Sequence, residues 1–506
     1  MGIPTYFNHI VKRHNNIIKE TCYVNSDYLF IDANSLVYDT INELKSKGEE
    51  FTNIIIFNDV ISYISKLIDI IKPSYKTYVC FDGMPPLPKI IQQKQRRFKS
   101  NITKQILNQD NKKTWNTNQI TPGTDFMCEL NEFFTNHYKT NRQVIFSGPN
   151  EPMEGEHKIR KIITENEQMF YHKNCIIYGL DADLIMLGLL INLHNTNIFL
   201  HKETKYFEYI GNVEKDKYYV FKMNTLSTEI HKIMNTDNYK QSVMDYCFMC
   251  FLCGNDFMPH LPSISLRNSG IDYLIDTYSK LNKKELIDVT QNKINWEYFH
   301  KFVFCLKEKE QERIKENLFW KISMQQKVRS YTYEEKLNNL PVMDNDIEKY
   351  LIDNIDEYNQ LILKNKNIKS ICMNYLKMLE WNWDYYVGNP VVNDIYYKYS
   401  YGPLFSDLLN YIPIFNCERL NTETSNIDPI NIYTQLYYVL PFQDHKTIIP
   451  KDIYEKTNKL VYRELPNLTK TLYNIDYFLC RYFWESHLET ENEDIYKLNN
   501  IIKNMI

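Results

Sequence analysis

Four short apolar runs, each followed closely by acidic residues, constrain the fold of this chain more than any other feature of its sequence. The runs span residues 28–31, 77–81, 143–146 and 175–178. Amphipathic helical patterns such as 54–71 and 156–170 lie between them. Apolar runs of this length suit buried strands, and strands that alternate with helices form parallel sheets covered on both faces. Residues 1–275 are therefore predicted to form an α/β domain with a mostly parallel sheet flanked by helices.

Two further regions follow this domain along the 506-residue chain. Residues 276–370 are rich in Lys, Glu and Asn at helical spacing, which predicts a helical connecting region. Residues 371–506 carry dense aromatic residues on mostly helical patterns, which predicts a largely helical second lobe.

Composition and charge exclude several classes of protein. No apolar run reaches the roughly 18 residues that a membrane-spanning helix needs, and the start of the chain lacks a signal-peptide pattern. The 11 scattered cysteines predict reduced thiols in a cytoplasm-like compartment. The net charge of −4 gives no global nucleic-acid signal, so any such signal must be local. Cys247, Cys250 and Cys253 lie in an apolar helical pattern, which favours buried thiols over a metal site.

Six carboxylates follow the predicted strands, at the edge where open parallel sheets bind ligands, and Asp256 follows the apolar run 246–253. The seven acids are Asp32, Asp82, Glu154, Glu156, Asp181, Asp183 and Asp256. Converging carboxylates repel one another unless cations join them. Such oxygen ligands suit two Mg²⁺ or Mn²⁺ ions, a pair that clamps a phosphodiester for attack by water. Any one of these acids alone is explained as a cap or turn residue, and acid-x-acid pairs also occur in other metal-dependent enzymes.

A basic helix face is predicted directly after Asp82. Pro88 suits the first turn of a helix. The residues that then share one face, at positions i, i+4, i+7 and i+8, are Lys89, Gln93, Arg96 and Arg97. A solvated surface face is the simpler interpretation. Beside a predicted metal ligand, however, these donors can bind a terminal phosphate, as a nuclease working from a 5′ end requires.

Seven stretches in the first 270 residues resemble the eukaryotic Xrn-type 5′→3′ exoribonucleases. They are MGIPTYF (1–7), IDAN (31–34), FDGMPPLPKIIQQKQRRFKS (81–100), ITPGTDFM (120–127), SGPNEPMEGEHKI (147–159), YGLDADLIMLGL (178–189) and CFLCGNDFMPHLP (250–262). Weaker matches follow at 375–386, 396–409 and 435–441.

The resemblance implies a PIN/flap-nuclease-like fold and a role for each matched residue. The seven acids match the family's metal-binding set for two Mg²⁺ or Mn²⁺ ions. Lys89, Gln93, Arg96 and Arg97 match its pocket for a 5′-monophosphate. The implied activity is processive degradation of 5′-monophosphorylated single-stranded RNA to mononucleotides in mRNA decay. RNA and a decapping enzyme are then the expected partners of a monomeric protein that binds no membrane.

Three positions depart from the family's pattern. The family's Asp-Met-Asn-Gly turn reads Asp32-Ala33-Asn34-Ser35 here. Tyr38 replaces a histidine that stacks on the terminal base, and a tyrosine can also stack. Ile395 stands where a tryptophan is expected, which puts processivity on structured RNA in question. The short length and the A/T-rich codon bias suggest a virus-encoded member acting in the host cytoplasm or a viral factory.

Two other functions remain open at this point. A flap-type or 5′→3′ DNA nuclease shares the acidic set, but the forms DGMPPLPK, EGEHK and GNDFMPHLP argue against it. A catalytically inactive RNA-binding protein would have lost acids, and all seven are present. His157, next to Glu156, is expected to support the site or the helix surface rather than to act as a base.

Overall fold

The computed structural model describes most of the chain. The described residues are 6–48, 50–107, 115–179, 182–202, 214, 217–281, 284–343, 355–364, 366–415, 419–421, 429–489 and 493–506.

Seven strands form one sheet in the order β1-β7-β6-β5-β2-β3-β4. Their bounds are β1 Ile18–Glu20, β2 Tyr28–Asp32, β3 Lys76–Cys80, β4 Val144–Ser147, β5 Asn174–Tyr178, β6 Asn197–Lys202 and β7 Tyr219–Lys222. The strands from β6 to β4 run parallel, whereas β7 is antiparallel to β6 and β1 is antiparallel to β7. The four predicted strands are β2 to β5, so the α/β class and the mostly parallel sheet are confirmed.

The order of strands reverses around β2. The chain runs from β2 outward to β3 and β4, then returns to place β5 on the other side of β2. In open parallel sheets the crevice beyond such a switch point binds ligands. Asp32, the last residue of β2, lies at this point, paired in register with Cys80 of β3.

Helices cover both faces of the sheet because the strand side chains alternate between two cores. Leu29 and Ile31 pack with α2 (Asn34–Lys47), α3 (Asn53–Ile71) and α5 (Asp125–Tyr138). Phe30 packs on the opposite face. The helices on that face are α1 (Tyr6–Arg13), α6 (Gly155–Glu165), α8 (Asp183–Asn192) and α9 (Met223–Met234). The same core continues away from the sheet into α10 (Tyr239–Phe251), α11 (Gly270–Lys280) and α12 (Trp296–Lys307).

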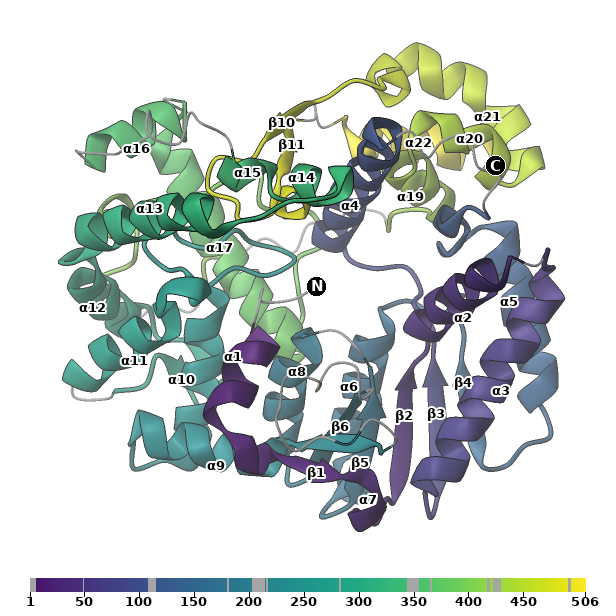
Figure 1. Cartoon of the computed structure of the whole chain (residues 1–506), viewed down its shortest axis with the longest axis horizontal. Coiled ribbons are helices and arrows are strands. Elements are labelled where there is room, and N and C mark those ends of the chain that lie inside the picture. The colour runs from purple at the N-terminus through teal and green to yellow at the C-terminus, as the bar shows by residue number, and fades with distance from the viewer. Residues whose placement is uncertain are drawn as a thin grey trace.

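The long helix α17 (Ile368–Val387) joins the second of these cores, and Figure 1 shows it descending toward α8 and α6. A separate core links α4 (Leu87–Ile106) to the C-terminal helices. These helices are α19 (Ile432–Val439), α20 (Phe442–Ile448), α21 (Lys451–Glu464) and α22 (Ile495–Met505). Residues far apart in sequence thus enclose α4.

The remaining elements are short or lie at the periphery. The helices are α7 Glu167–Phe170, α13 Glu310–Lys327, α14 Tyr333–Asn338, α15 Leu340–Met343, α16 Ile355–Leu361 and α18 Phe405–Leu408. Two small hairpins pair β8 (Ile287–Asp288) with β9 (Lys293–Ile294) and β10 (Asn474–Asp476) with β11 (His487–Glu489). The largely helical C-terminal part agrees with the prediction, while domain boundaries at residues 275 and 370 stay a prediction. Among the described helices, none has the length and apolarity needed to cross a bilayer.

Candidate metal and phosphate site

Six of the seven predicted acids lie at, or within a few residues of, the end of a strand or helix. Asp32 ends β2, and Asp82 follows β3 by two residues. Glu154 and Glu156 begin α6, and Asp183 begins α8. Asp256 lies in the loop after α10. Asp181 lies outside the described residues.

Asp82 is held by three hydrogen bonds. The side-chain amide of Asn34 donates to its Oδ2 over 2.7 Å, and the Asp82 backbone N–H donates to Asn34 Oδ1 over 3.1 Å. The backbone N–H of Gly155 donates to Asp82 Oδ1 over 2.8 Å. Burial and the nearby Glu154 charge raise the pKa of Asp82 to about 6 despite these donors. Although the turn at residues 32–35 departs from the family pattern, its Asn34 still orients Asp82.

Gly155 allows Asp32 to approach α6 closely. A Cβ at position 155 would lie 2.5 Å from Asp32 Oδ1 and 3.0 Å from the Cys80 carbonyl oxygen. Together with the Gly155 bond to Asp82, this contact brings the carboxylates of β2, β3 and α6 to one place.

Lys89 of α4 reaches into the acids. Its ammonium lies 2.7 Å from Glu154 Oε1 and 3.0 Å from Asp256 Oδ2, and all three side chains are less than one tenth exposed. Burial acts to lower the pKa of Lys89, but Glu154 and Asp256 outweigh it and the pKa is raised. Burial acts to raise the pKa of Asp256, but Lys89 outweighs it and the pKa is lowered. Lys89 therefore begins the predicted basic face and also bridges two acids of the cluster.

Lys158 binds the backbone at the ends of two neighbouring strands. The sequence patterns assigned no role to this residue. Its ammonium donates to the carbonyl oxygens of Phe81 and Gly148 over 2.8 and 2.7 Å. These carbonyls follow β3 and β4 directly, so one buried lysine fixes both strand ends. Two lysines thus accompany six carboxylates in the described part of the cluster, a charge balance and an oxygen donor set that fit divalent cations.

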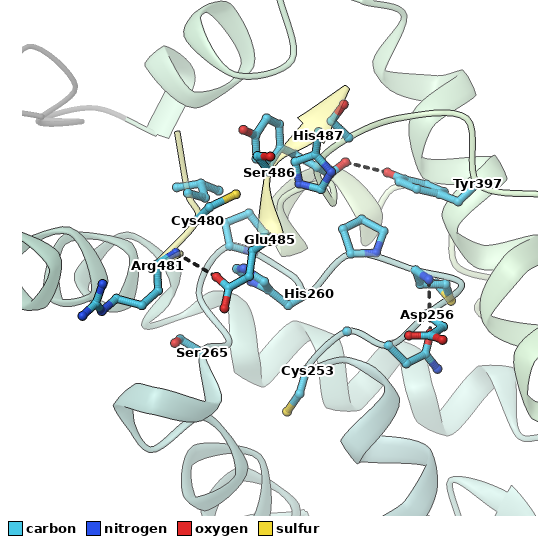
Figure 2. A pocket seen from close by; sticks show the side chains of 18 of the residues that line it. Cys253, Asp256, His260, Ser265, Tyr397, Cys480, Arg481, Glu485, Ser486 and His487 are labelled. Atoms are coloured by element: carbon cyan, nitrogen blue, oxygen red, sulfur yellow. Dashed lines mark hydrogen bonds between the residues drawn. The ribbon is translucent and has the colours of Figure 1, made fainter. Parts of the chain in front are cut away.

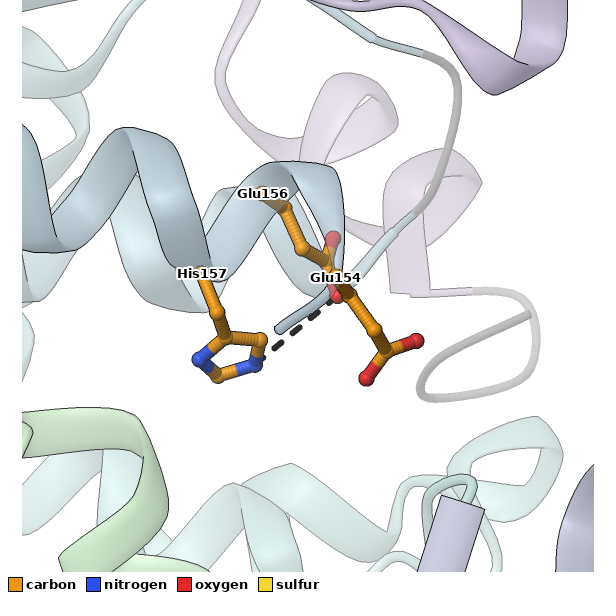
Figure 3. Close-up of side chains that lie close together, drawn as sticks. All are labelled: Glu154, Glu156 and His157. Atoms are coloured by element: carbon orange, nitrogen blue, oxygen red, sulfur yellow. Dashed lines mark ion pairs between the residues drawn. The ribbon is translucent and has the colours of Figure 1, made fainter. Parts of the chain in front are cut away.

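Glu154, Glu156 and His157 bring their ligand atoms within 4.8 Å of one another (Figure 3). Nε2 of His157 lies 3.9 Å from Glu156 Oε1. Burial lowers the pKa of His157 well below its usual value, so the ring is neutral at neutral pH and this contact is not a charged ion pair. His157 is also buried against the ring of Tyr385, with 3.8 Å between centroids.

The other members of the basic face differ in exposure. Arg97 and Gln93 are buried, whereas Arg96 is exposed. Burial lowers the pKa of Arg97 to about 10, so the guanidinium stays charged at neutral pH. Its buried Nη1 has no hydrogen-bond partner among the described residues, and Tyr38 lies near enough to interact with its charge. The structure thus brings the predicted base-stacking residue beside a buried cation.

A cavity of about 330 Å³ adjoins this region (Figure 2). Arg96 and Asp256 both lie on its wall, together with His260, Glu485 and His487. One acid of the cluster, Asp256, and one residue of the basic face, Arg96, therefore share this cavity.

Two other predicted features lie in the core. Ile395 is partly buried and packs against the larger core of the sheet. The cysteines of the CxxCxxC pattern are buried, as predicted. Burial raises the pKa of each of these thiols.

Comparisons with known proteins match two regions of the chain. The family model described as "XRN 5'-3' exonuclease N-terminus" matches residues 1–203, and "Xrn1 helical domain" matches residues 236–357. "5'-3' exoribonuclease 1" of Saccharomyces cerevisiae is 32% identical over 317 residues, which cover 55% of this chain and 21% of that protein. "5'-3' exoribonuclease 2" of the same yeast is 29% identical over 356 residues, covering 55% and 35%.

A human relative gives a similar result. "5'-3' exoribonuclease 1" of Homo sapiens is 30% identical over 317 residues, covering 55% of this chain and 18% of that protein. The chain thus spans about a fifth to a third of the length of these curated relatives. Among solved structures, "The catalytic core of Rad2 in complex with DNA substrate (complex III)" aligns with a TM-score of 0.34 and 14% identity. That alignment covers 81% of this chain and 94% of the other, and at this score it supports no conclusion.

Proposed function

Because this chain belongs to the Xrn family of 5′-3′ exonucleases, we propose that it is a 5′→3′ exoribonuclease acting on 5′-monophosphorylated single-stranded RNA. Mononucleotides are its products and two Mg²⁺ or Mn²⁺ ions its cofactors. The observation that carries this proposal is the gathering of carboxylates around the Lys89 ammonium, on the helix that also bears the buried Arg97.

The carboxylates would hold the metal ions. The proposed ligands are Asp32, Asp82, Glu154, Glu156, Asp181, Asp183 and Asp256. When bound, the ions supply Lewis-acid stabilisation of a phosphodiester and an activated water. The protein's own part is to fix the ligands: Asn34 and Gly155 orient Asp82, and Lys89 draws Glu154 and Asp256 together.

The basic face would hold the 5′ end of the RNA. Arg97 offers a buried Nη1 with no hydrogen-bond partner in the described part of the chain, Arg96 lies on the cavity wall shared with Asp256, and Gln93 is a buried residue of the same helix. The side-chain amide of Gln435 in α19 donates to Gln93 Oε1 over 3.3 Å. Both amides are buried, which favours a compact monophosphate over a triphosphate or a cap. Tyr38 would stack on the terminal base.

A carboxylate substitution tests the metal assignment. Asp256→Asn is expected to abolish RNA hydrolysis while leaving RNA binding largely intact, because the substitution removes a proposed metal ligand and retains the basic face. Asp288→Asn, in the β8–β9 hairpin, is the matched control and should cleave at the wild-type rate. Undiminished hydrolysis by the Asp256→Asn variant would falsify the assignment.

Two comparisons separate the remaining alternatives. Rates on RNA and DNA single strands of matched sequence distinguish an exoribonuclease from a flap-type or 5′→3′ DNA nuclease, and the names of the relatives favour RNA. Failure of the wild-type protein to bind Mn²⁺ would favour an inactive RNA-binding protein. In the cell we propose a monomer that acts in cytoplasmic mRNA decay after a decapping enzyme has exposed the 5′-monophosphate.

A further inference from the structure

Helix α17 brings aromatic residues of the second lobe directly against the acidic cluster. Trp381 and Tyr386 are 1% exposed, and Tyr385 is 7% exposed. Aromatic rings buried to this degree ordinarily serve to pack a core. Tyrosine, however, carries a hydroxyl that needs a hydrogen-bond partner when it is buried.

The ring of Tyr385 is fixed on several sides. Trp381 stacks on it with centroids 4.9 Å apart and planes at 19°, and His157 lies against it at 3.8 Å. Phe257, the neighbour of Asp256 in sequence, meets the ring edge-on at 5.5 Å. With these contacts the ring has little freedom to turn, so the direction of its hydroxyl is set.

The hydroxyl groups of the two tyrosines reach the acids of the cluster. Tyr385 donates to Glu154 Oε2 over 3.1 Å, while Lys89 contacts Oε1 of the same carboxylate. Tyr386 lies close enough to Asp183 for its hydroxyl to interact with that carboxylate. Burial raises the pKa of both phenols well above the usual value, so both stay protonated and serve as donors.

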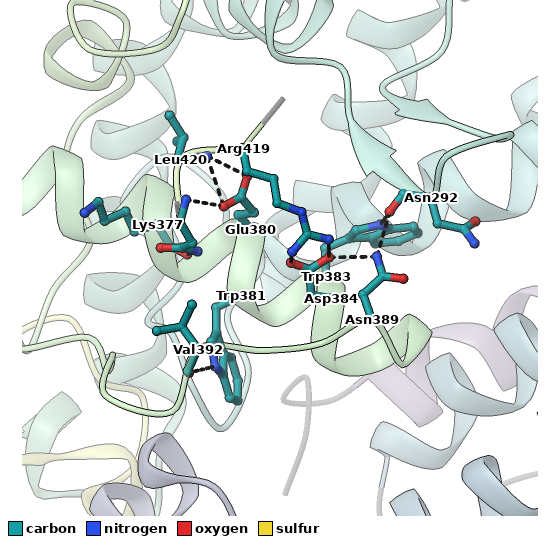
Figure 4. Close-up of polar contacts among 11 residues, drawn as sticks. Asn292, Lys377, Glu380, Trp381, Trp383, Asp384, Asn389, Val392, Arg419 and Leu420 are labelled. Atoms are coloured by element: carbon teal, nitrogen blue, oxygen red, sulfur yellow. Dashed lines mark hydrogen bonds and ion pairs between the residues drawn. The ribbon is translucent and has the colours of Figure 1, made fainter. Parts of the chain in front are cut away.

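Further polar contacts fix the rotation of α17 (Figure 4). The indole N–H groups of Trp381 and Trp383 donate over 2.9 Å to the carbonyl oxygens of Val392 and Asn292. Arg419 lies 3.2 Å from the Asp384 carboxylate.

The end of α17 is also fastened to α6, the helix that begins with the glutamates of the cluster. Nη1 of Arg160 donates to the Val387 carbonyl oxygen over 3.4 Å. Gly388 ends α17 with φ of 85°, and a Cβ there would lie 1.8 Å from the same Nη1. A side chain at this position would push Arg160 away, so glycine permits the close contact of the two helices.

We propose that Tyr385 and Tyr386 are positioning residues that hold Glu154 and Asp183 in the geometry required to bind the metal ions. This inference rests on the proposed function. The second lobe then contributes to catalysis because its helix α17 orients carboxylates of the cluster. This role is in addition to its contact with α4. Hydrogen-bonding partners of metal ligands typically change metal affinity or activity by about 10- to 100-fold when they are removed.

Tyr385→Phe and Tyr386→Phe test the proposal by deleting only the hydroxyls. The probe is Mn²⁺ alone, titrated by calorimetry or electron paramagnetic resonance without RNA. Each variant is expected to bind Mn²⁺ about 10-fold more weakly than the wild type. At saturating Mn²⁺ the KM for RNA should be unchanged. Tyr375→Phe is the matched control, since this buried tyrosine of α17 directs its hydroxyl at the Pro259 carbonyl oxygen, 3.5 Å away.

The outcomes separate this inference from the proposed function. Wild-type affinity for Mn²⁺ in both variants would overturn the positioning role while leaving the proposed function intact. A wild-type protein that binds no Mn²⁺ would overturn both. Equal weakening in the Tyr375→Phe control would also overturn it, because the effect would then be a general softening of α17. Thermal unfolding identifies a variant that does not fold. In that case the Mn²⁺ affinity of the other tyrosine variant tests the positioning role.

Discussion

Replacement of Lys89 by methionine should destabilise the metal-free protein and make it more responsive to metal. The ammonium lies 2.7 Å from Glu154 and 3.0 Å from Asp256, with the three side chains 9%, 7% and 4% exposed. Removing one partner of a buried ion pair costs about 3–5 kcal/mol, because the remaining charges stay buried. Methionine retains most of the apolar stem, so loss of packing adds little.

Added metal should reverse this loss. A divalent cation replaces the missing positive charge, and the variant no longer has an ammonium that competes for the same oxygens. Binding at a hundredfold excess over the dissociation constant stabilises a folded protein by about 2.7 kcal/mol. Mn²⁺ should therefore raise the melting temperature of Lys89→Met more than that of the wild type.

Thermal unfolding in EDTA and in Mn²⁺ is the assay, and Lys94→Met is the matched control. Lys94 is a buried lysine of the same helix, with its ammonium 4.3 Å from the centre of the Tyr438 ring. Burial lowers its pKa to about 8, so its removal should cost little. A melting temperature of Lys89→Met equal to that of the wild type in EDTA would contradict this role of Lys89, and so would equal stabilisation of both lysine variants by Mn²⁺.

Three further substitutions test other parts of the account. Lys158→Met removes two charged hydrogen bonds to strand ends, at about 1.5–3 kcal/mol each, and should lower both melting temperature and cleavage rate; an unchanged melting temperature would contradict this. Burial lowers the pKa of His445 from 6.5 to about 4. Above pH 6.5 the neutral ring therefore contributes about 3 kcal/mol to the free energy of unfolding, and this contribution is lost as the pH falls toward 4. In His445→Gln the free energy of unfolding should fall less steeply between pH 6.5 and 4 than in the wild type. The same dependence on pH in both proteins would count against this role of His445. Gly155→Ala places a Cβ 2.5 Å from Asp32 Oδ1 and should weaken Mn²⁺ binding; wild-type affinity would disprove the close approach.

The strands and their acids could be predicted because both signals are local in sequence. Apolar runs locate β2 to β5, and parallel strands carry the residues after them to one edge of the sheet. Asp32 and Asp82 follow from that rule alone. The bond from Gly155 to Asp82 does not, because it depends on how α6 approaches β3.

Contacts between distant segments could not be predicted in the same way. Helical spacing places Lys89 on the basic face, but its contact with Asp256 depends on the angle at which α4 leaves the sheet. Tyr385 and Glu154 are 231 positions apart, so a pattern of helical aromatics could indicate burial and not the partner of the hydroxyl. The adjacent tyrosines near the end of α17 are the one sequence signal that could have drawn attention to them.

We propose that the basic face of α4 selects a 5′-monophosphate for hydrolysis at the acidic cluster. The most direct test incubates end-labelled RNA with a 5′-monophosphate, 5′-hydroxyl, 5′-triphosphate or cap in the presence of Mg²⁺. We expect the 5′-monophosphate RNA to be degraded to mononucleotides from its 5′ end, while the other three RNAs persist. Equal degradation of all four RNAs would contradict it.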